Sequence, residues 1–117
     1  MEKQLFLFDV DGTITESGEK MKHEYISYLN NLKKHNIEIG VVGGGKIDNI
    51  LSQTEGVFFD HYFSECGCVY NRYLENELIN IYSKNIRRHE LYSKINILIK
   101  CTLNFLSKVD YEITVIL

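Results

Sequence analysis

The sequence predicts an α/β fold in which parallel strands alternate with helices. Apolar, strand-like runs at residues 5–8, 37–42 and 57–63 are separated by segments whose apolar residues recur at helical spacing. Two carboxylates, Asp9 and Asp11, directly follow the first run. Open α/β sheets bind ligands at the carboxyl ends of their strands. We therefore expect the chemistry of this chain at the end of its first strand.

The first half of the chain is organised as two strand–helix units. Residues 20–35 form an amphipathic helix pattern, and Ile37 to Val42 follows as the second strand. Three glycines at 43–45 break that strand before a short predicted helix over 46–52. A third strand is expected over 57–63. Consecutive parallel strands joined by a helix form a right-handed crossover.

The second half changes in character after Gly67. The β-prone runs 68–73 and 78–82 are separated by polar residues, which predicts a hairpin. A long helix with apolar residues on two faces is expected over 86–106. Residues 111–117 are β-prone and predict a further strand.

Composition excludes several functional classes. The 117 residues carry 13 basic and 16 acidic side chains, and this net charge of −3 gives no general attraction to nucleic acid or anionic membranes. Neither a basic region followed by an apolar leader nor a run of ~18 apolar residues occurs. We therefore expect a cytoplasmic protein with neither nucleic-acid nor membrane partners.

The cysteines and histidines do not form a metal or disulfide pattern. Cys66, Cys68 and Cys101 are an odd number without paired metal-binding spacing, and we expect reduced thiols. Cys66 and Cys68 are two residues apart, which is poor geometry for a disulfide. The four histidines are dispersed, so no zinc site is expected.

The segment Asp9–Thr13, with sequence DVDGT, carries the strongest chemical signal. Carboxylates with a following Gly and Thr suit a hard cation such as Mg²⁺ together with a phosphoryl group. One Asp can act as nucleophile while its neighbour moves a proton. Residues i and i+2 of a strand point the same way, so both acids face one pocket if the chain stays extended through Val10. The alternative is a solvated acidic turn, which Asp-Gly commonly forms.

The glycine segment after the second strand is a second candidate site. Glycines between a strand and a helix expose backbone N–H groups that can bind phosphate, and Lys46 adds positive charge there. The alternative is an ordinary loose turn between the two elements.

Four segments in order carry a resemblance to a known family. Asp9–Thr13 resembles the first motif of the haloacid dehalogenase superfamily of phosphotransferases. Together with Ile39–Gly44, Phe63–Gly67 and Asn85–His89, it narrows the resemblance to eukaryotic-type phosphomannomutases. The resemblance extends over almost the whole chain, up to Leu117.

The resemblance implies a fold and a domain organisation. Residues 1–82 are expected to form the first part of a Rossmann-like haloacid dehalogenase core. Residues 83–117 are expected to begin an incomplete α/β cap domain. In the family the cap closes over the substrate and mediates dimers, so a homodimer through the cap is a possible assembly.

The resemblance also implies a reaction. Phosphomannomutases interconvert mannose 6-phosphate and mannose 1-phosphate, towards GDP-mannose, through a phospho-aspartate, with Mg²⁺ and a hexose 1,6-bisphosphate activator. Asp9 is then the nucleophile and a magnesium ligand. Asp11 is the general acid and base and binds the metal through its backbone carbonyl. Thr13, the Gly43–Gly44 backbone and Lys46 contact the phosphoryl group of the hexose phosphate.

Several positions depart from the family pattern. Gly45 and Lys46 replace the family's Ser and Asp, and Gly18 stands where the family has a phosphate-binding Arg, with Lys20 the nearest basic residue. The Lys and the distal acids that complete the site lie beyond the cap in the family. The alternatives to a mutase are therefore a non-catalytic remnant that keeps the first half of the fold, or a magnesium-dependent sugar phosphatase.

Overall fold

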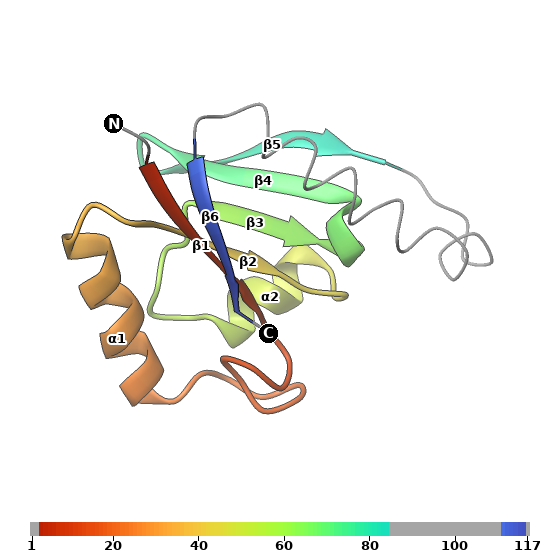
Figure 1. The fold of residues 1–117 in the computed structure, drawn as a ribbon. Helices are drawn as coiled ribbons and strands as arrows, with labels where there is room; N and C mark the ends of the chain where they lie inside the picture. Colours follow the sequence, from red (N-terminus) through yellow and green to blue (C-terminus); the bar gives the residue numbers. More distant parts are fainter. Residues whose placement is uncertain (1–2, 85–110, 117) are drawn as a thin grey trace.

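The computed structural model describes residues 3–84 and 111–116, which form one six-stranded sheet with two helices (Figure 1). The strand order is β5-β4-β3-β2-β1-β6. The elements are β1 (Lys3–Asp9), α1 (His23–Lys34), β2 (Glu38–Val42), α2 (Ile47–Gln53), β3 (His61–Ser64), a 3₁₀ turn (Glu65–Gly67), β4 (Val69–Leu74), β5 (Glu77–Ser83) and β6 (Tyr111–Ile116).

Strands β1, β2 and β3 are parallel neighbours, as the sequence predicts. Helices α1 and α2 join them in turn and pack on the same face of the sheet. α1 contributes Leu29 and Leu32 to the core on that face, and α2 contributes Ile50. The expected α/β class with a mainly parallel sheet is confirmed.

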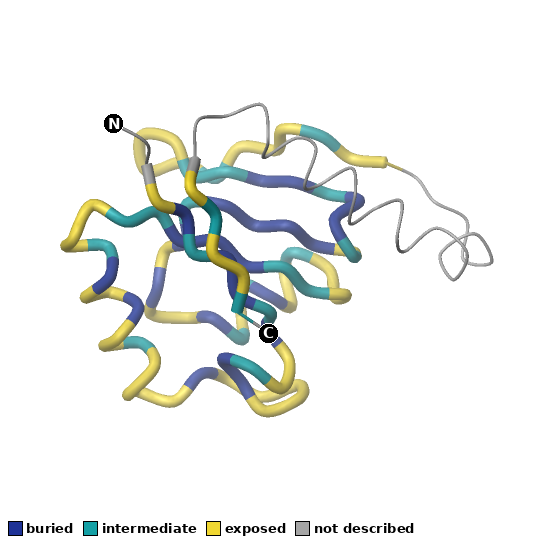
Figure 2. The backbone as a smooth tube through the Cα atoms, in the orientation of Figure 1, coloured by how far each residue is buried: buried dark blue, intermediate teal, exposed yellow. Residues whose placement is uncertain are grey.

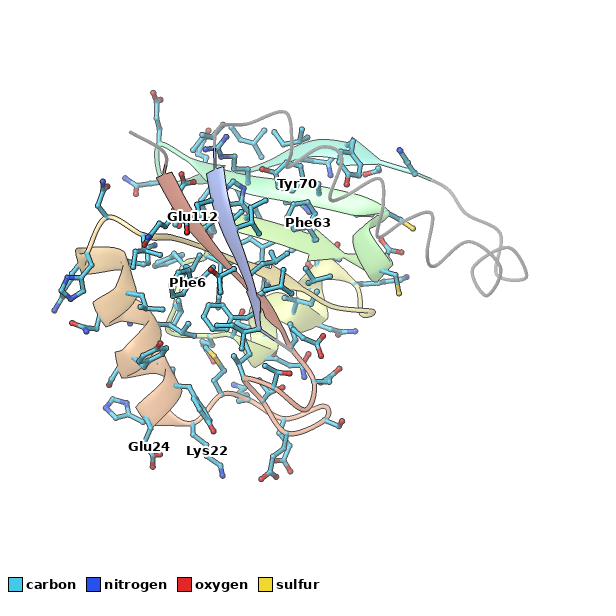
Figure 3. The ribbon with its side chains drawn as sticks, viewed as in Figure 1. Phe6, Lys22, Glu24, Phe63, Tyr70 and Glu112 are labelled. Carbon is cyan, nitrogen blue, oxygen red and sulfur yellow. The ribbon has the colours of Figure 1, made fainter. Side chains whose placement is uncertain are left out.

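The opposite face of the sheet carries its own apolar cluster. Leu5 and Leu7 of β1 lie there with Phe63 of β3 and Tyr70 of β4, and all four side chains are buried. The rings of Phe63 and Tyr70 stack with centroids 4.5 Å apart (Figure 3). Burial is concentrated in the central strands, whereas the outer side of α1 and parts of the loops are exposed (Figure 2).

The third strand is shorter than the sequence predicts. β3 begins at His61, and residues 57–60 approach the sheet as a loop. Val57 and Phe59 are buried there, and the Asp60 carboxylate accepts a hydrogen bond from the Ile39 amide at 2.9 Å. The apolar run reflects burial of this loop in the core, and an apolar pattern alone does not distinguish burial from strand pairing.

The expected hairpin is present as β4 and β5, which pair antiparallel. Glu75 and Asn76 connect the two strands and both have positive φ, 51° and 65°. Two successive residues with positive φ are the signature of a type I′ turn, whose twist matches that of the strands it joins.

The last strand lies within the same sheet as the first half of the chain. β6 pairs in parallel with β1, with Leu5 opposite Ile113 and Phe8 opposite Ile116. The sequence predicts this strand, but in a segment expected to open a second domain. It occupies the side of β1 that β2 leaves free, where backbone groups would otherwise be unpaired. The division between residues 82 and 83 stays a prediction.

Two expectations fall outside the described residues. They are the long helix over 86–106 and the whole Asn85–His89 segment. Within residues 3–84 and 111–116, no helix is long and apolar enough to cross a bilayer. Cys66 and Cys68 are both free cysteines in the structure.

Candidate active site

The DVDGT segment forms a tight loop at the carboxyl end of β1. The strand ends at Asp9, and the amides of residues 13, 14 and 15 all donate to the Val10 carbonyl, at 3.2, 3.1 and 3.2 Å. Gly12 has a φ of 79°, which a residue without a Cβ adopts at no steric cost. The chain therefore leaves the extended conformation directly after Asp9, earlier than the sequence interpretation supposes.

Asp9 and Thr13 lie together at this strand end. Thr13 Oγ1 donates to Asp9 Oδ2 across 3.5 Å, and both residues are half-buried. The second oxygen of Asp9 has no hydrogen bond within the described part of the chain. This carboxylate is thus held from one side and open on the other, as a nucleophile or metal ligand requires.

Asp11 is exposed and its carboxylate is turned towards the loop that follows. Oδ1 accepts hydrogen bonds from the Gly18 amide at 3.0 Å and from Gln53 Nε2 at 2.8 Å. These bonds, the Gly18 amide first, hold the pKa of Asp11 below its ordinary value of 3.8 because they stabilise the carboxylate form. The Gln53 contact is not predictable from the sequence, since 42 residues separate the partners.

The glycine segment lies beside this loop, at the end of β2. The Val10 amide donates to the Val42 carbonyl at 3.2 Å, which joins the two segments. A Cβ at Gly43 would lie 3.2 Å from Ile50 Cδ1 and 3.4 Å from Val10 Cγ2, so only glycine fits there without movement of its neighbours. Close packing therefore accounts for Gly43.

The backbone amides of the two expected phosphate-binding glycines differ. The Gly43 N–H donates to the Phe63 carbonyl at 3.0 Å and is already used. The Gly44 N–H has no acceptor among the described residues, and Gly44 is exposed. Gly44 is consequently the better placed donor for an anion.

The turn after β3 holds the glycine segment in place. The Glu65 amide donates to the Gly45 carbonyl at 2.9 Å, and the Cys66 amide donates to the Gly43 carbonyl at 3.0 Å. Glu65 and Cys66 both have positive φ, 50° and 58°, a conformation uncommon for residues other than glycine. The sequence interpretation missed this contact, although Phe63–Gly67 is one of the segments that carry the resemblance.

Three lysines of the described part of the chain, Lys20, Lys22 and Lys46, form no ion pair with Asp9. Lys46 is exposed at the N-cap of α2. Lys20 pairs with Glu55 at 2.9 Å and Lys22 with Glu16 at 3.6 Å. A cavity of about 220 Å³ opens beside them, lined by residues that include Gly12, Thr13, Ile14, Lys20, Lys22 and Tyr25. Lys22 lies near Glu24 at the start of α1 (Figure 3).

The oxygen atoms at the strand end fit a magnesium ion. The free oxygen of Asp9 and the Asp11 carbonyl, which accepts no hydrogen bond in the described residues, are hard donors of the kind Mg²⁺ prefers. Within residues 3–84 and 111–116, no group of three His, Cys, Asp or Glu side chains comes together as a metal cluster. Mg²⁺ usually keeps several waters and one or two protein carboxylates, so two protein ligands are compatible with it.

Curated sequences similar to this chain include phosphomannomutases from several organisms. The similarity to the phosphomannomutase of Galdieria sulphuraria is 36% identity over 91% of this chain and 41% of the relative. The phosphomannomutase of Babesia bovis is 30% identical over 94% of this chain and 44% of the relative. That of Arabidopsis thaliana is 34% identical over 92% of this chain and 43% of the relative. The chain thus spans about two fifths of the length of these relatives.

Solved structures and a family model agree on the fold. A haloacid dehalogenase-like hydrolase from B. subtilis matches with a TM-score of 0.62 and 22% identity, over 83% of this chain and 33% of that one. A phosphatase of the haloalkanoate enzyme superfamily from Bacteroides thetaiotaomicron matches with a TM-score of 0.61 and 18% identity, over 86% of this chain and 36% of that one. The model of the haloacid dehalogenase-like hydrolases matches residues 6–115. With Asp9 and Thr13 together at the end of β1, this chain belongs to the haloacid dehalogenase-like hydrolase family.

Proposed function

We propose that this chain carries the nucleophile half of a phosphomannomutase-type site, which transfers a phosphoryl group between positions of a hexose phosphate. The proposal rests on the half-open Asp9 carboxylate beside Thr13 at the end of β1. It is supported by the similarity to phosphomannomutases over more than 90% of this chain.

In the proposed reaction the Asp9 carboxylate attacks the phosphorus of the bisphosphate and becomes an acyl phosphate. The sugar oxygen leaves and takes a proton from Asp11. In the second half-reaction a hydroxyl of the hexose phosphate attacks the same phosphorus, gives its proton to Asp11, and releases Asp9 as a carboxylate. Thr13, the free amide of Gly44 and Lys46 orient the phosphoryl oxygens, while Gly43 shapes the loop by packing.

The metal in this proposal is held by the free carboxylate oxygen of Asp9 and the backbone carbonyl of Asp11. When bound, Mg²⁺ neutralises charge on the phosphoryl oxygens. In this proposal the side chain of Asp11 is not a metal ligand: its Oδ1 accepts from Gly18 and Gln53, and its Oδ2 is left free by the described residues. It is therefore available for proton transfer.

A second candidate is a magnesium-dependent sugar phosphatase. Asp11 and Gly12 are exposed, so water reaches the loop that carries the nucleophile. A phospho-aspartate at Asp9 would then pass its phosphoryl group to water, with Asp11 as the base. Closure of the site by a cap favours transfer of the phosphoryl group to a sugar over transfer to water. The expected cap over residues 83–117 and its dimers therefore belong to the mutase proposal. The expected cytoplasmic location is part of the same proposal.

The experiment incubates the purified chain with Mg²⁺, mannose 1-phosphate and a catalytic amount of hexose 1,6-bisphosphate, and measures mannose 6-phosphate and free phosphate. We expect formation of mannose 6-phosphate that Asp9→Asn abolishes. Asp48→Asn is the matched control, because Asp48 is exposed on α2 and has no role in the proposed reaction.

The outcomes separate the candidates. Free phosphate without mannose 6-phosphate, again lost in Asp9→Asn, identifies a phosphatase. A folded wild-type chain without either product contradicts both enzymes and leaves the non-catalytic remnant. Turnover that survives Asp9→Asn contradicts the assigned nucleophile.

A further inference from the structure

Both hydrogen bonds to the Asp11 side chain reach the same oxygen. The Gly18 amide and the Gln53 side-chain amide donate to Oδ1, at 3.0 and 2.8 Å. Oδ2 accepts no hydrogen bond within the described part of the chain. The carboxylate therefore has one fixed oxygen and one free oxygen, and the fixed one determines where the free one lies.

Gln53 is itself fixed to the loop that it contacts. Its backbone carbonyl accepts a hydrogen bond from the Met21 amide at 2.9 Å, and its side-chain nitrogen Nε2 also donates to the Glu19 backbone carbonyl at 3.4 Å. Gln53 is the last residue of α2, which Ile50 anchors in the core. A side chain that extends from a backbone fixed in this way, and whose nitrogen has a second acceptor in the same loop, loses little further freedom when it binds a carboxylate.

The same loop has a second tie to the end of α2 that avoids Asp11. The Lys20 ammonium lies 2.9 Å from the Glu55 carboxylate, and both side chains are exposed. Glu55, which only ties the loop to the end of α2, and Gln53, which also contacts Asp11, thus lie two residues apart in the chain. This arrangement allows the two roles to be separated by mutation.

We propose that Gln53 is the positioning residue for Asp11, holding Oδ1 so that Oδ2 is the atom that exchanges the proton with the sugar oxygen. The inference rests on the proposed function for its proton-transfer step. As the sugar oxygen bonds to phosphorus, its proton moves to Oδ2 and the bond from phosphorus to Asp9 breaks. In the reverse direction the proton returns from Oδ2 to the leaving sugar oxygen.

The test compares Gln53→Met with Glu55→Met in the full chain. Methionine matches the length of both side chains and removes their hydrogen bonds, so the first variant leaves Asp11 Oδ1 with the Gly18 amide alone, and the second breaks only the Lys20 contact. Three-bond NMR couplings to Asp11 Cγ report its χ1 rotamer without any need for turnover. We expect one rotamer in the wild type and in Glu55→Met, and averaging in Gln53→Met.

Kinetics give the second readout. In Gln53→Met we expect kcat to fall about 10- to 100-fold, in line with the effect of a misplaced catalytic group, with KM within about twofold of wild type. Glu55→Met should leave both constants unchanged. Gln53→Glu is a second variant of the same length that places a carboxylate against Asp11, and it should show the same loss.

A single Asp11 rotamer in Gln53→Met overturns the positioning role. So do equal kinetic losses in Gln53→Met and Glu55→Met, because they would show that closure of the loop is what matters. A wild type without turnover contradicts the proposed function instead, and the NMR couplings then decide the positioning role alone.

Discussion

Ile113 of β6 lies opposite Leu5 of β1 in a parallel ladder, and it packs against the apolar cluster on the face of the sheet away from the helices. Leu5 is fully buried in that cluster, whereas Ile113 is half-buried. The strand that ends at Asp9, the proposed nucleophile, thus depends on residues more than a hundred positions later for part of its packing.

Truncation of Ile113 tests this dependence. Ile113→Ala should lower the free energy of unfolding by about 1–2 kcal/mol, since a half-buried side chain loses part of its transfer free energy. Thr114→Ala, on the neighbouring exposed residue, should cost less than about 0.5 kcal/mol. Urea unfolding followed by circular dichroism measures both. Equal effects in the two variants would show that β6 does not pack on β1 in solution.

The hairpin turn offers a stabilising substitution. Glu75 has a φ of 51°, and an asparagine tolerates that conformation better than a glutamate does. Glu75→Asn should raise the free energy of unfolding by about 0.5 kcal/mol. Glu77→Asn, at the start of the extended strand β5, should give no gain because asparagine is unfavourable in strands. Urea denaturation midpoints of the two variants distinguish these outcomes.

The hydrogen bonds to Asp11 predict a pH dependence of stability. The folded pKa of Asp11 is lowered from 3.8, chiefly by the Gly18 amide, so its contribution is fully present above pH 3.8 and is lost as the pH falls through the lower folded pKa. Since Asp11 is exposed, the contribution is at most about 0.5 kcal/mol.

Unfolding of the wild type and of Asp11→Asn between pH 7 and pH 2.5 measures this contribution. The two proteins should differ in stability at neutral pH and converge in acid, where Asp11 is protonated. Glu19→Gln, in the same loop but without a side-chain hydrogen bond among the described residues, is the control. A gap that persists at the lowest pH would contradict the assigned cause.

The two thiols near the glycine segment should differ in reactivity. Cys68 is buried, and burial raises the pKa of its thiol, so little reactive thiolate is present at pH 8. Cys66 is partly exposed beside Gly44. Iodoacetamide should therefore modify Cys66 before Cys68, as peptide mapping by mass spectrometry can show. In urea the difference should disappear, and equal rates in the folded protein would refute the prediction.

Alanine at Gly12 isolates the cost of the loop conformation. A Cβ at Gly12 would meet no atom within 4 Å, but the φ of 79° is unfavourable for alanine. Gly12→Ala should destabilise the chain by about 1–2 kcal/mol. Gly44→Ala, at an ordinary φ and with its nearest contact at 3.7 Å, should cost less than about 0.5 kcal/mol. Thermal unfolding in the absence of ligands compares them.

The sequence predicts the elements of this fold because their signals are local. The apolar residues of β1 and the helical spacing over α1 are periodic within one element, and both elements are present. The type I′ conformation of Glu75 is less visible, since the following Asn76 is its only local indicator. The early end of β1 depends on three amides that share the Val10 carbonyl, which no residue pattern records.

The parts that the sequence does not predict are pairings between distant residues. Gln53 reaches Asp11 from another element, and the Gly43 amide is used by Phe63 of a neighbouring strand. Each follows from the way the strands and α2 are placed against one another. The resemblance points to both glycines as phosphate contacts, but which of their amides remains available, that of Gly44, follows only from the fold.

The position of β6 limits how this sheet can be extended. A strand has two hydrogen-bonding sides, and those of β1 are taken by β2 and by β6. Any additional segment that is to pair with β1, directly beside Asp9, must first displace β6. Completing the site by such a segment is therefore a strand exchange. The exchange cannot be faster than the separation of β6 from β1.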